Sequence, residues 1–183
     1  GTVKTSETTK AELSRMMVGR PVQLEVEKDE ANPVEAVLEV KGLCVPSKLY
    51  KRDAVHNVSF TARAGEILCI AGIDGNGQSE LIEAITGIRK VEKGSVVQNG
   101  KDITNISPKK IRDAGLAHIP EDRNKRGLNR AMSIVDNLVA VRLDEAPFSK
   151  NMLITKDDQD KYAEEMVKQF DIRPTDYNLP TSA

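Results

Sequence analysis

A glycine-rich loop between an apolar run and an amphipathic segment constrains this chain more than any other feature. Residues 67–71 (ILCIA) form a short apolar run that predicts a buried parallel strand. Residues 72–79 (GIDGNGQS) follow, and then an amphipathic segment with Leu81, Ile82 and Ile85 on one face, which should end at Gly87. Glycines let backbone N–H groups approach phosphate oxygens, and a helix N-terminus adds positive potential. Strand, loop and helix therefore predict a phosphate-binding loop.

The loop departs from the phosphate-binding pattern G-x-x-x-x-G-K-[ST] at one position, because Gln78 stands where the pattern has lysine. Taken alone, such a loop is weak evidence, since many strand–helix turns contain glycine for geometric reasons. The backbone cradle would remain, but a charge-assisted contact worth about 1.5–3 kcal/mol would be lost, or about tenfold to a hundredfold in binding. That contact also stabilises transition-state charge, so we expect hydrolysis to suffer more than binding.

Composition excludes several classes of protein. The 183 residues are 39% hydrophobic and carry a formal net charge of -1, which gives no electrostatic reason to expect nucleic acid as a partner. No apolar run is long enough to span a bilayer. We expect Cys44 and Cys69 to be reduced, buried packing residues, and we interpret the isolated His56 and His118 as structural.

The remaining patterns predict a β-rich lobe followed by a helical lobe. A short helix should end at Gly19, and an acidic linker should follow it. We expect strands at residues 36–40, 55–61, 94–98 and 116–119, with a turn at residues 99–100. Helices should begin after Ser107, Ser133 and Thr155, the last carrying Tyr162, Met166 and Phe170.

Several motifs, in this order, resemble the ATPase domain of ABC transporters. After the glycine loop come GSVVQNGKDI (residues 94–103), an S-P-x-x-x-R-x-x-G helix (residues 107–115) and AHIPEDR (residues 117–123). GIDGNGQSEL together with PEDR resembles the second ATPase domain of the tandem proteins that power simple-sugar and nucleoside importers, and the Gly-Gln pair favours the nucleoside branch.

The resemblance implies an α/β fold, with a P-loop NTPase core of the ABC-ATPase type, an antiparallel β subdomain and a partial helical subdomain. It divides the chain into residues 1–33, the tail of a preceding ATPase domain and its linker, residues 34–130, the nucleotide-binding core, and residues 131–183, the partial helical subdomain. The leucine-serine-glycine-glycine signature of the family is not found in these 183 residues, so we expect a fragment.

The resemblance also implies the site residues, with ATP and Mg²⁺ as the cofactors. Ser79 would bind Mg²⁺, and Tyr50 would stack on adenine, although an ordinary surface tyrosine is an equal alternative. Glu121 stands where active family members have a glutamine that senses the γ-phosphate side and faces the membrane subunits. Residues 122–126 would lie near the coupling helices of those subunits, or else form a solvated loop. The residues expected around the phosphates are Gly72, Asp74, Gly75, Asn76, Gly77, Gln78, Ser79 and Glu80.

Residues 138–145 (LVAVRLDE) imitate the acidic strand of such ATPases, with Asp144 as a metal ligand and Glu145 as the catalytic base. We favour a helix instead, because Arg142 would be buried in the middle of a covered strand at high cost. The capped helical spacing from Ser133 accounts for the same residues. We therefore expect no catalytic residue here and no ATP hydrolysis by this chain alone.

The implied whole is an ATPase subunit that couples ATP binding and hydrolysis to the import of nucleosides or simple sugars. Its partners would be transmembrane permease subunits, the other ATPase domain of the same chain and, indirectly, a periplasmic or lipoprotein solute-binding protein. Its place would be the cytoplasmic face of the plasma membrane. This half would be the degenerate, weakly hydrolysing one. Two alternatives stay open: a non-catalytic regulatory or interaction module on a degenerate P-loop fold, and an unrelated NTPase with residues 138–145 as its metal-binding strand.

Overall fold

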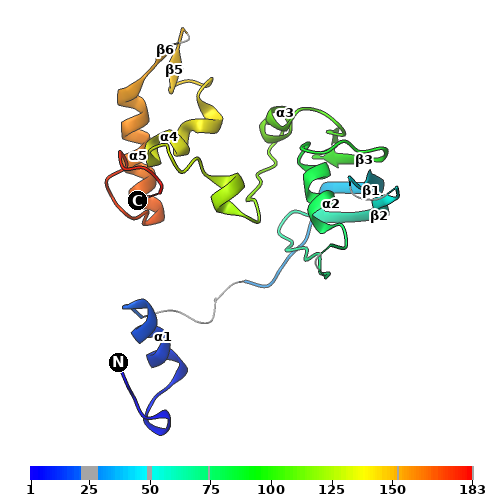
Figure 1. The fold of residues 1–183 in the computed structure, drawn as a ribbon. Helices are drawn as coiled ribbons and strands as arrows, with labels where there is room; N and C mark the ends of the chain where they lie inside the picture. The colour runs from blue at the N-terminus through cyan, green and yellow to red at the C-terminus, as the bar shows by residue number, and fades with distance from the viewer. Residues whose placement is uncertain (22–28, 49–50, 74, 152, 183) are drawn as a thin grey trace. The chain divides into compact units, whose positions relative to one another are not determined.

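The computed structural model describes residues 1–21, 29–48, 51–73, 75–151 and 153–182. The predicted site residues Tyr50 and Asp74 lie outside the described residues. The chain divides into two compact units, Gly1–Leu116 and Ala117–Ala183, and each has elements of its own (Figure 1).

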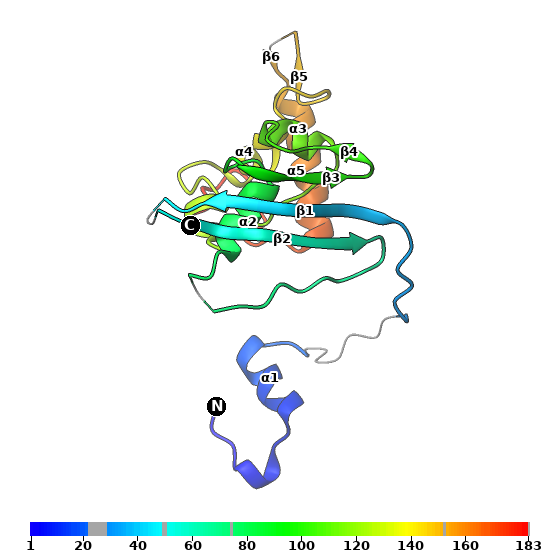
Figure 2. The ribbon, with the colours of Figure 1, turned by 90° about the vertical axis from the view of Figure 1, so that its right-hand side faces the viewer.

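An antiparallel sheet forms the centre of the first unit. Its strand order is β2-β1-β3-β4, and every neighbouring pair is antiparallel. Figure 2 shows β1 and β2 running side by side along most of their length. The strands predicted at residues 36–40, 55–61 and 94–98 are confirmed. Burial alternates along much of β2 and β3, whereas β1 also buries three consecutive residues, Leu43, Cys44 and Val45. The bounds are β1 Ala36–Pro46, β2 Asp53–Arg63, β3 Lys93–Gln98 and β4 Lys101–Asp102.

Two helices complete the core of this unit. Helix α2 (Gln78–Ile85) buries Leu81, Ala84 and Ile85 in the same hydrophobic cluster as Leu43, Val45 and Val55 of the sheet. Helix α3 (Pro108–Asp113) follows the predicted N-cap and adds one fully buried isoleucine to that cluster. The glycine loop is thereby held between β2 and a helix whose apolar face is anchored.

Two predicted strands are wrong. Residues 67–71 and 116–119 belong to no strand in the part of the chain that the structure describes. Ile67 is 86% exposed and Ile119 is 91% exposed, so neither run is buried as the apolar pattern suggested. The physical reason is that a parallel strand needs hydrogen-bonded neighbours and covering helices. The described sheet has no parallel pair to accept either run.

The N-terminal segment holds a short 3₁₀ helix, η1 (Thr5–Glu7), and helix α1 (Lys10–Val18). Thr9 caps α1 by accepting the N–H of Glu12 at 3.2 Å. Gly19, at φ 78°, ends it in the left-handed conformation that glycine adopts most readily. The helix predicted to end at Gly19 is therefore confirmed.

The second unit contains two helices joined by a short hairpin. Its buried hydrophobic residues are Ile134, Val135, Val139, Phe148 and Ala163. The Phe148 and Tyr162 rings meet edge to face with 5.0 Å between centroids. The elements are the π-helix η2 (Arg123–Gly127), α4 (Ile134–Val139), the 3₁₀ helix η3 (Ala140–Arg142), β5 (Ser149–Lys150), β6 (Leu153–Ile154) and α5 (Lys156–Phe170).

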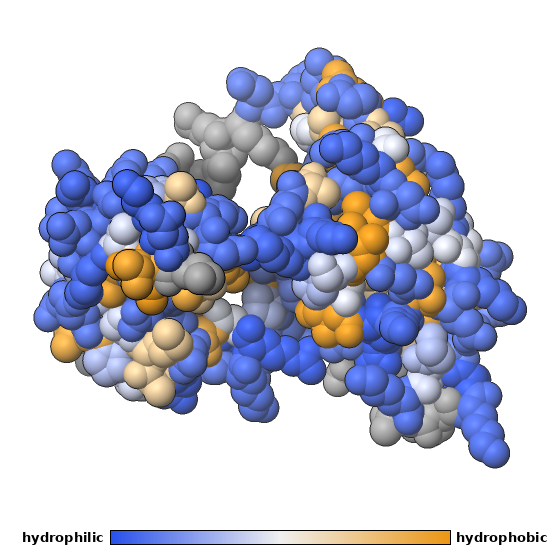
Figure 3. Space-filling model, turned by 90° about the horizontal axis from the view of Figure 1, so that it is seen from above, coloured by the Kyte–Doolittle hydropathy of each residue, from blue (hydrophilic) through white to orange (hydrophobic). Residues whose placement is uncertain are grey.

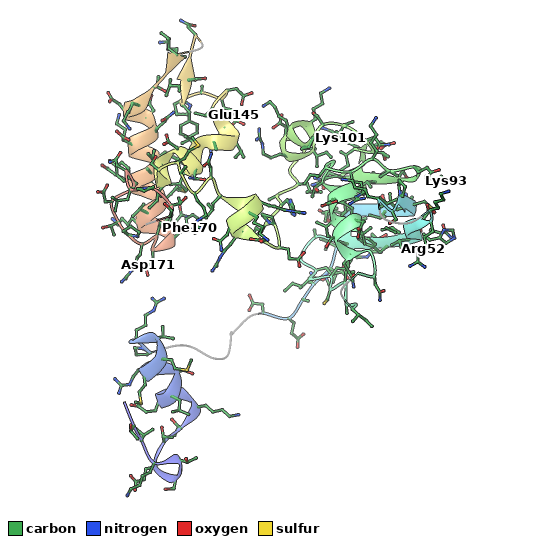
Figure 4. The ribbon with its side chains drawn as sticks, viewed as in Figure 1. Arg52, Lys93, Lys101, Glu145, Phe170 and Asp171 are labelled. Carbon is green, nitrogen blue, oxygen red and sulfur yellow. The ribbon has the colours of Figure 1, made fainter. Side chains whose placement is uncertain are left out.

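The helical interpretation is confirmed for residues 138–142, and residues 143–145 form a turn and a bend, so no strand is present there. Ser133 and Asp136 form a complete capping box at the start of α4. Arg142 is half-buried rather than enclosed, and its Nε donates to Glu145 Oε2 at 2.9 Å. Figure 4 shows Glu145 beyond the end of this helical segment. A strand that presents Asp144 and Glu145 to a metal is thus ruled out, and with it the unrelated NTPase alternative. The cap predicted at Thr155 differs, because the Thr155 hydroxyl donates to the Pro147 carbonyl instead.

Hydrophilic side chains dominate the face in Figure 3, and hydrophobic atoms appear on it as separate patches. No helix among the described residues is long and apolar enough to cross a membrane.

Candidate functional site

The glycine loop turns on two residues with left-handed backbone conformations. Gly75 has φ 84° and Gly77 has φ 93°, values that residues with a Cβ adopt only with strain. Between them, the Asn76 N–H donates to the Ile73 carbonyl at 3.2 Å and closes the turn. Gly77 is the N-cap of α2, and its carbonyl accepts the N–H of Leu81 at 2.9 Å. The loop therefore leads directly into the first turn of α2.

Close packing requires glycine at position 77, whereas at position 72 an added Cβ would meet only a flexible side chain. A Cβ on Gly77 would collide with the backbone carbonyl of Ala54 in β2, and Gly77 is buried. A Cβ on Gly72 would collide with the side-chain amide of Gln78. Gly75 has open space around it, so only its backbone conformation requires glycine there. Gly77 therefore packs the loop closely against β2.

Gln78 is the first residue of α2, and its side chain turns back over the loop toward Gly72. The amide thus lies at the loop, next to Gly72. An amide carries no charge but keeps a donor and an acceptor. The position can hydrogen-bond to a phosphate oxygen without neutralising it.

The first turn of α2 also carries Ser79 and Glu80. Ser79 is exposed, so its hydroxyl is accessible beside the helix N-terminus. The Glu80 carboxylate lies 3.8 Å from Arg89 Nη2. That guanidinium pairs more closely with Glu83, at 2.8 Å. Residues 72–80 contain neither lysine nor arginine, so the positive potential of this cradle comes from backbone N–H groups and the helix end.

The structure brings the described loop residues together as expected, but Glu121 belongs to the second unit. Glu121 is exposed and immediately precedes Asp122. The Asp122 carboxylate accepts the N–H groups of Asn124 and Lys125, each at 3.1 Å, and so begins η2. The assignments of Glu121 and of Tyr50 to a nucleotide site stay predictions.

The sequence profile of the family described as "ABC transporter" matches residues 55–182. The chain belongs to the ABC transporter family. The ABC fold is also seen in solved structures. A nucleotide-free ATP-binding cassette from an ABC transporter superimposes with a TM-score of 0.63 at 22% identity, covering 81% of this chain and 58% of that one.

Two curated relatives of this chain are import ATP-binding proteins. The chain is 39% identical over 175 residues to the guanosine import ATP-binding protein NupO of Bacillus subtilis (strain 168), covering 96% of this chain and 34% of the relative. It is 40% identical over 172 residues to the nucleoside import ATP-binding protein NupA of Lactococcus lactis subsp. cremoris (strain MG1363), covering 94% and 34%. The chain thus spans about a third of the length of these curated relatives.

Sequence patterns missed one contributor to the loop. Ala54, at the start of β2, is far from the loop in sequence, yet its carbonyl packs against Gly77. Nothing in the residue type marks Ala54, because its role comes from its backbone oxygen. Only the three-dimensional placement of β2 could reveal it.

Proposed function

We propose that this chain is a nucleotide-binding domain of an ABC importer ATPase subunit, and that residues 72–80 bind the phosphates of ATP. In the whole protein, two such domains would couple ATP binding and hydrolysis to the import of nucleosides or simple sugars. The subunit would act with transmembrane permease subunits and, indirectly, with a solute-binding protein. It would be held at the cytoplasmic face of the membrane by those permeases.

The glycine cradle at the start of α2 carries this proposal. Backbone N–H groups in left-handed turns and at a helix N-terminus form a concave site for anions. The loop supplies both features, at Gly75 and Gly77 and at the first turn of α2. Its packing against Ala54 holds the cradle in shape before a ligand arrives, which lowers the entropy cost of binding.

The residues present fit ATP together with Mg²⁺. The exposed Ser79 hydroxyl would bind Mg²⁺, which prefers oxygen ligands and usually keeps several waters. Bound Mg²⁺ would neutralise phosphate charge. Tyr50 would stack on adenine, and Glu121 would face the γ-phosphate side and the permease subunits. Gln78 would offer an uncharged hydrogen bond in place of a lysine contact.

Because Gln78 is neutral, we further propose that this site is the weakly hydrolysing half of a two-domain ATPase. Removing one charge-assisted contact weakens ground-state binding by about tenfold to a hundredfold. Developing charge in the transition state loses the same partner, so catalysis falls further than affinity. In this account, residues 1–33 are the end of a preceding domain and its linker, residues 34–130 are the core, and residues 131–183 are part of a helical subdomain.

Calorimetric titration of the 183-residue chain with Mg-ATP and with adenosine tests the phosphate cradle. If the loop recognises phosphates, ATP should bind at least about tenfold more tightly than adenosine, because anionic oxygens meet charge-assisted donors. Ser79→Ala should reduce the gain that Mg²⁺ gives to ATP binding. Ser107→Ala, at the N-terminus of α3, is the matched control. Equal affinities for ATP and adenosine would contradict the proposal.

Steady-state turnover tests the absence of a catalytic base. We expect the chain alone to release no phosphate from Mg-ATP above background, and Glu145→Gln to change nothing, because Glu145 pairs with Arg142 at the end of a helical segment. This expected result does not depend on the structure of the glycine loop. Mg²⁺-dependent turnover that Glu145→Gln abolishes would make Glu145 a catalytic residue and overturn this view.

A further inference from the structure

Three side chains with different donor atoms meet at the end of the first sheet, away from the glycine loop residues themselves. They are Cys44 of β1 and Asp53 and His56 of β2, and their donor atoms all lie within 4.8 Å of one another. His56 Nδ1 is 3.3 Å from Asp53 Oδ2. Among the residues that the structure describes, this is a group of thiol, imidazole and carboxylate with no role in the nucleotide site.

Irregular strand pairing brings these residues to one face. In a regular strand, residues 53 and 56 would point to opposite faces, because side chains alternate. Here Val45 pairs with Val55, while Pro46 pairs with Asp53, so β2 has one extra residue between the two pairs. A second extra residue of β2 lies between the Leu43–Val58 and Val45–Val55 pairs. Such bulges re-aim side chains, and they often do so at functional positions.

Cys44 lies on the face of β1 opposite the hydrophobic core. Its neighbours Leu43 and Val45 are both 0% exposed and belong to the core cluster, so alternation turns Cys44 the other way. The Cys44 thiol is nevertheless covered, with 7% of the residue exposed. The His56 side chain, by contrast, is 82% exposed.

The backbone also supplies a donor to the sulfur. Asn57 adopts a left-handed conformation, φ 51°, and its N–H donates to Cys44 Sγ at 3.3 Å. In metal sites, such hydrogen bonds orient ligands and tune their basicity. The bond from Asn57 therefore helps to fix the position of the Cys44 sulfur beside Asp53 and His56.

We propose that Cys44, Asp53 and His56 bind Zn²⁺, with water as the fourth ligand. Thiolate, imidazole and carboxylate are the ligands that Zn²⁺ takes in proteins, at about 2.0–2.3 Å. Donors at those distances in a tetrahedral site stand about 3.5 Å apart, so the cluster needs only a small contraction. The exposed His56 side chain can supply it. On binding, Zn²⁺ replaces the thiol proton of Cys44, and the solvent takes that proton.

The charges of the ligand set match the ion. One thiolate and one carboxylate balance the two positive charges of Zn²⁺, and the neutral imidazole completes the set. Figure 4 shows Arg52 and Lys93 at the same end of the first unit. Arg52 precedes Asp53 in the chain, and Lys93 pairs with Cys44 in the sheet. Both residues are exposed.

The site lies beside the strand that supports the glycine loop. Asp53 and His56 flank Ala54 and Val55, and both the Ala54 carbonyl and the Val55 side chain pack against Gly77. A bound ion would tie this part of β2 to β1 and limit its movement. Zn²⁺ binding therefore stabilises the hairpin on which the loop rests, and it does not require nucleotide.

Cobalt titration of the reduced, metal-free chain tests this proposal, with Co²⁺ as an optical substitute for Zn²⁺. We expect a cobalt–thiolate charge-transfer band, which Zn²⁺ then displaces. Cys44→Ser, Asp53→Asn and His56→Ala should each weaken binding at least about tenfold. The chain has two cysteines and two histidines, so Cys69→Ser and His118→Ala change the other member of each pair. These control variants should leave the affinity for Co²⁺ unchanged.

If Cys44→Ser fails to fold, His56→Ala still tests the proposal. The His56 side chain is exposed, so its removal leaves the buried contacts of the sheet intact. Zn²⁺ should also raise the midpoint of thermal unfolding in the parent and in Cys69→Ser, but not in His56→Ala. No thiolate band, a band lost in Cys69→Ser, or unchanged affinity in His56→Ala would overturn the proposal. All titrations omit nucleotide, so their outcome is independent of the proposed ATP site.

Discussion

Both the backbone conformation and the packing require glycine at position 77. Its backbone is left-handed, at φ 93°, and the space that a Cβ would need is taken by the Ala54 carbonyl. Gly75 has a similar φ of 84° but open space around it. The phosphate-binding pattern requires glycine at position 77 but leaves position 75 open, and Gly75 was expected in the loop from the family resemblance. Neither predicted the difference in packing, because that difference depends on a strand far away in the chain.

This difference gives a matched pair of variants. Gly75→Ala should cost about 1–2 kcal/mol of stability, the penalty for an L-residue in the left-handed region. Gly77→Ala should cost about 3 kcal/mol or more, because the overpacking against Ala54 adds to that penalty. Urea unfolding followed by circular dichroism would measure both. Similar losses for the two variants would mean that Ala54 does not hold the loop.

Asp102 predicts a contribution to stability that depends on pH. Hydrogen bonds from the Thr104 side chain and from its backbone N–H, the latter at 2.8 Å, lower the pKa of Asp102. A lowered folded pKa means that the charged carboxylate stabilises the fold above the unfolded carboxyl range, near about pH 4. This stabilisation is lost as the pH falls through the folded pKa.

Asp102→Asn should therefore lower the unfolding midpoint at pH 7 and bring it closer to that of the parent at pH 3. Thermal unfolding across this range is the measurement. Glu165→Gln removes one charge from an exposed position in the middle of α5 and serves as the control. If Asp102→Asn lowers the unfolding midpoint by the same amount at both pH values, the size and shape of Asp102 matter rather than its charge.

At the scale of elements, local patterns predicted helices better than strands. Capping residues and helical spacing act within a few residues, so α3, α4 and the end of α1 were all predicted from the sequence. The apolar runs at residues 67–71 and 116–119 were predicted as strands, but a strand also needs neighbours. The sequence of a run does not say which strands will lie beside it. The bulges of β2, which gather Cys44, Asp53 and His56, were equally beyond local pattern.

The N-caps of α3 and α4 provide an element-scale test, because both are serines before six-residue helices. The Ser133 hydroxyl accepts the Asp136 N–H at 3.1 Å, whereas Ser107 makes no side-chain cap bond. Ser133→Ala should cost about 1 kcal/mol, a typical value for a lost N-cap. Ser107→Ala should stay within about 0.5 kcal/mol of the parent, as ordinary surface substitutions do. Denaturant unfolding compares the two.

A larger cost for Ser107→Ala than for Ser133→Ala would contradict the assignment of the capping box. It would also weaken the helical interpretation of residues 138–145, since that interpretation depends on where α4 begins. The rejected strand would then need to be considered again as a metal-binding element.

At the scale of the whole molecule, the comparisons with known proteins identify the family, and the local geometry of the loop supports phosphate binding. The profile match and the relatives establish an ABC transporter domain. The glycine cradle supports phosphate binding, and Gln78 sets its expected strength. The sequence motifs predicted the family because they extend over most of the chain. They could not predict where the Gln78 amide would lie, since that depends on how α2 meets the loop.

The most direct measurement of the central claim is the affinity of this chain for Mg-ATP before and after a lysine is placed at the loop. Gln78→Lys should tighten binding by about tenfold to a hundredfold, because it adds a charge-assisted contact to the phosphates. Gln169→Lys adds the same charge at an exposed position of α5 and should leave the affinity unchanged. Equal affinities of the parent and Gln78→Lys in calorimetry would contradict the claim that this loop cradles the phosphates of ATP and that Gln78 weakens it.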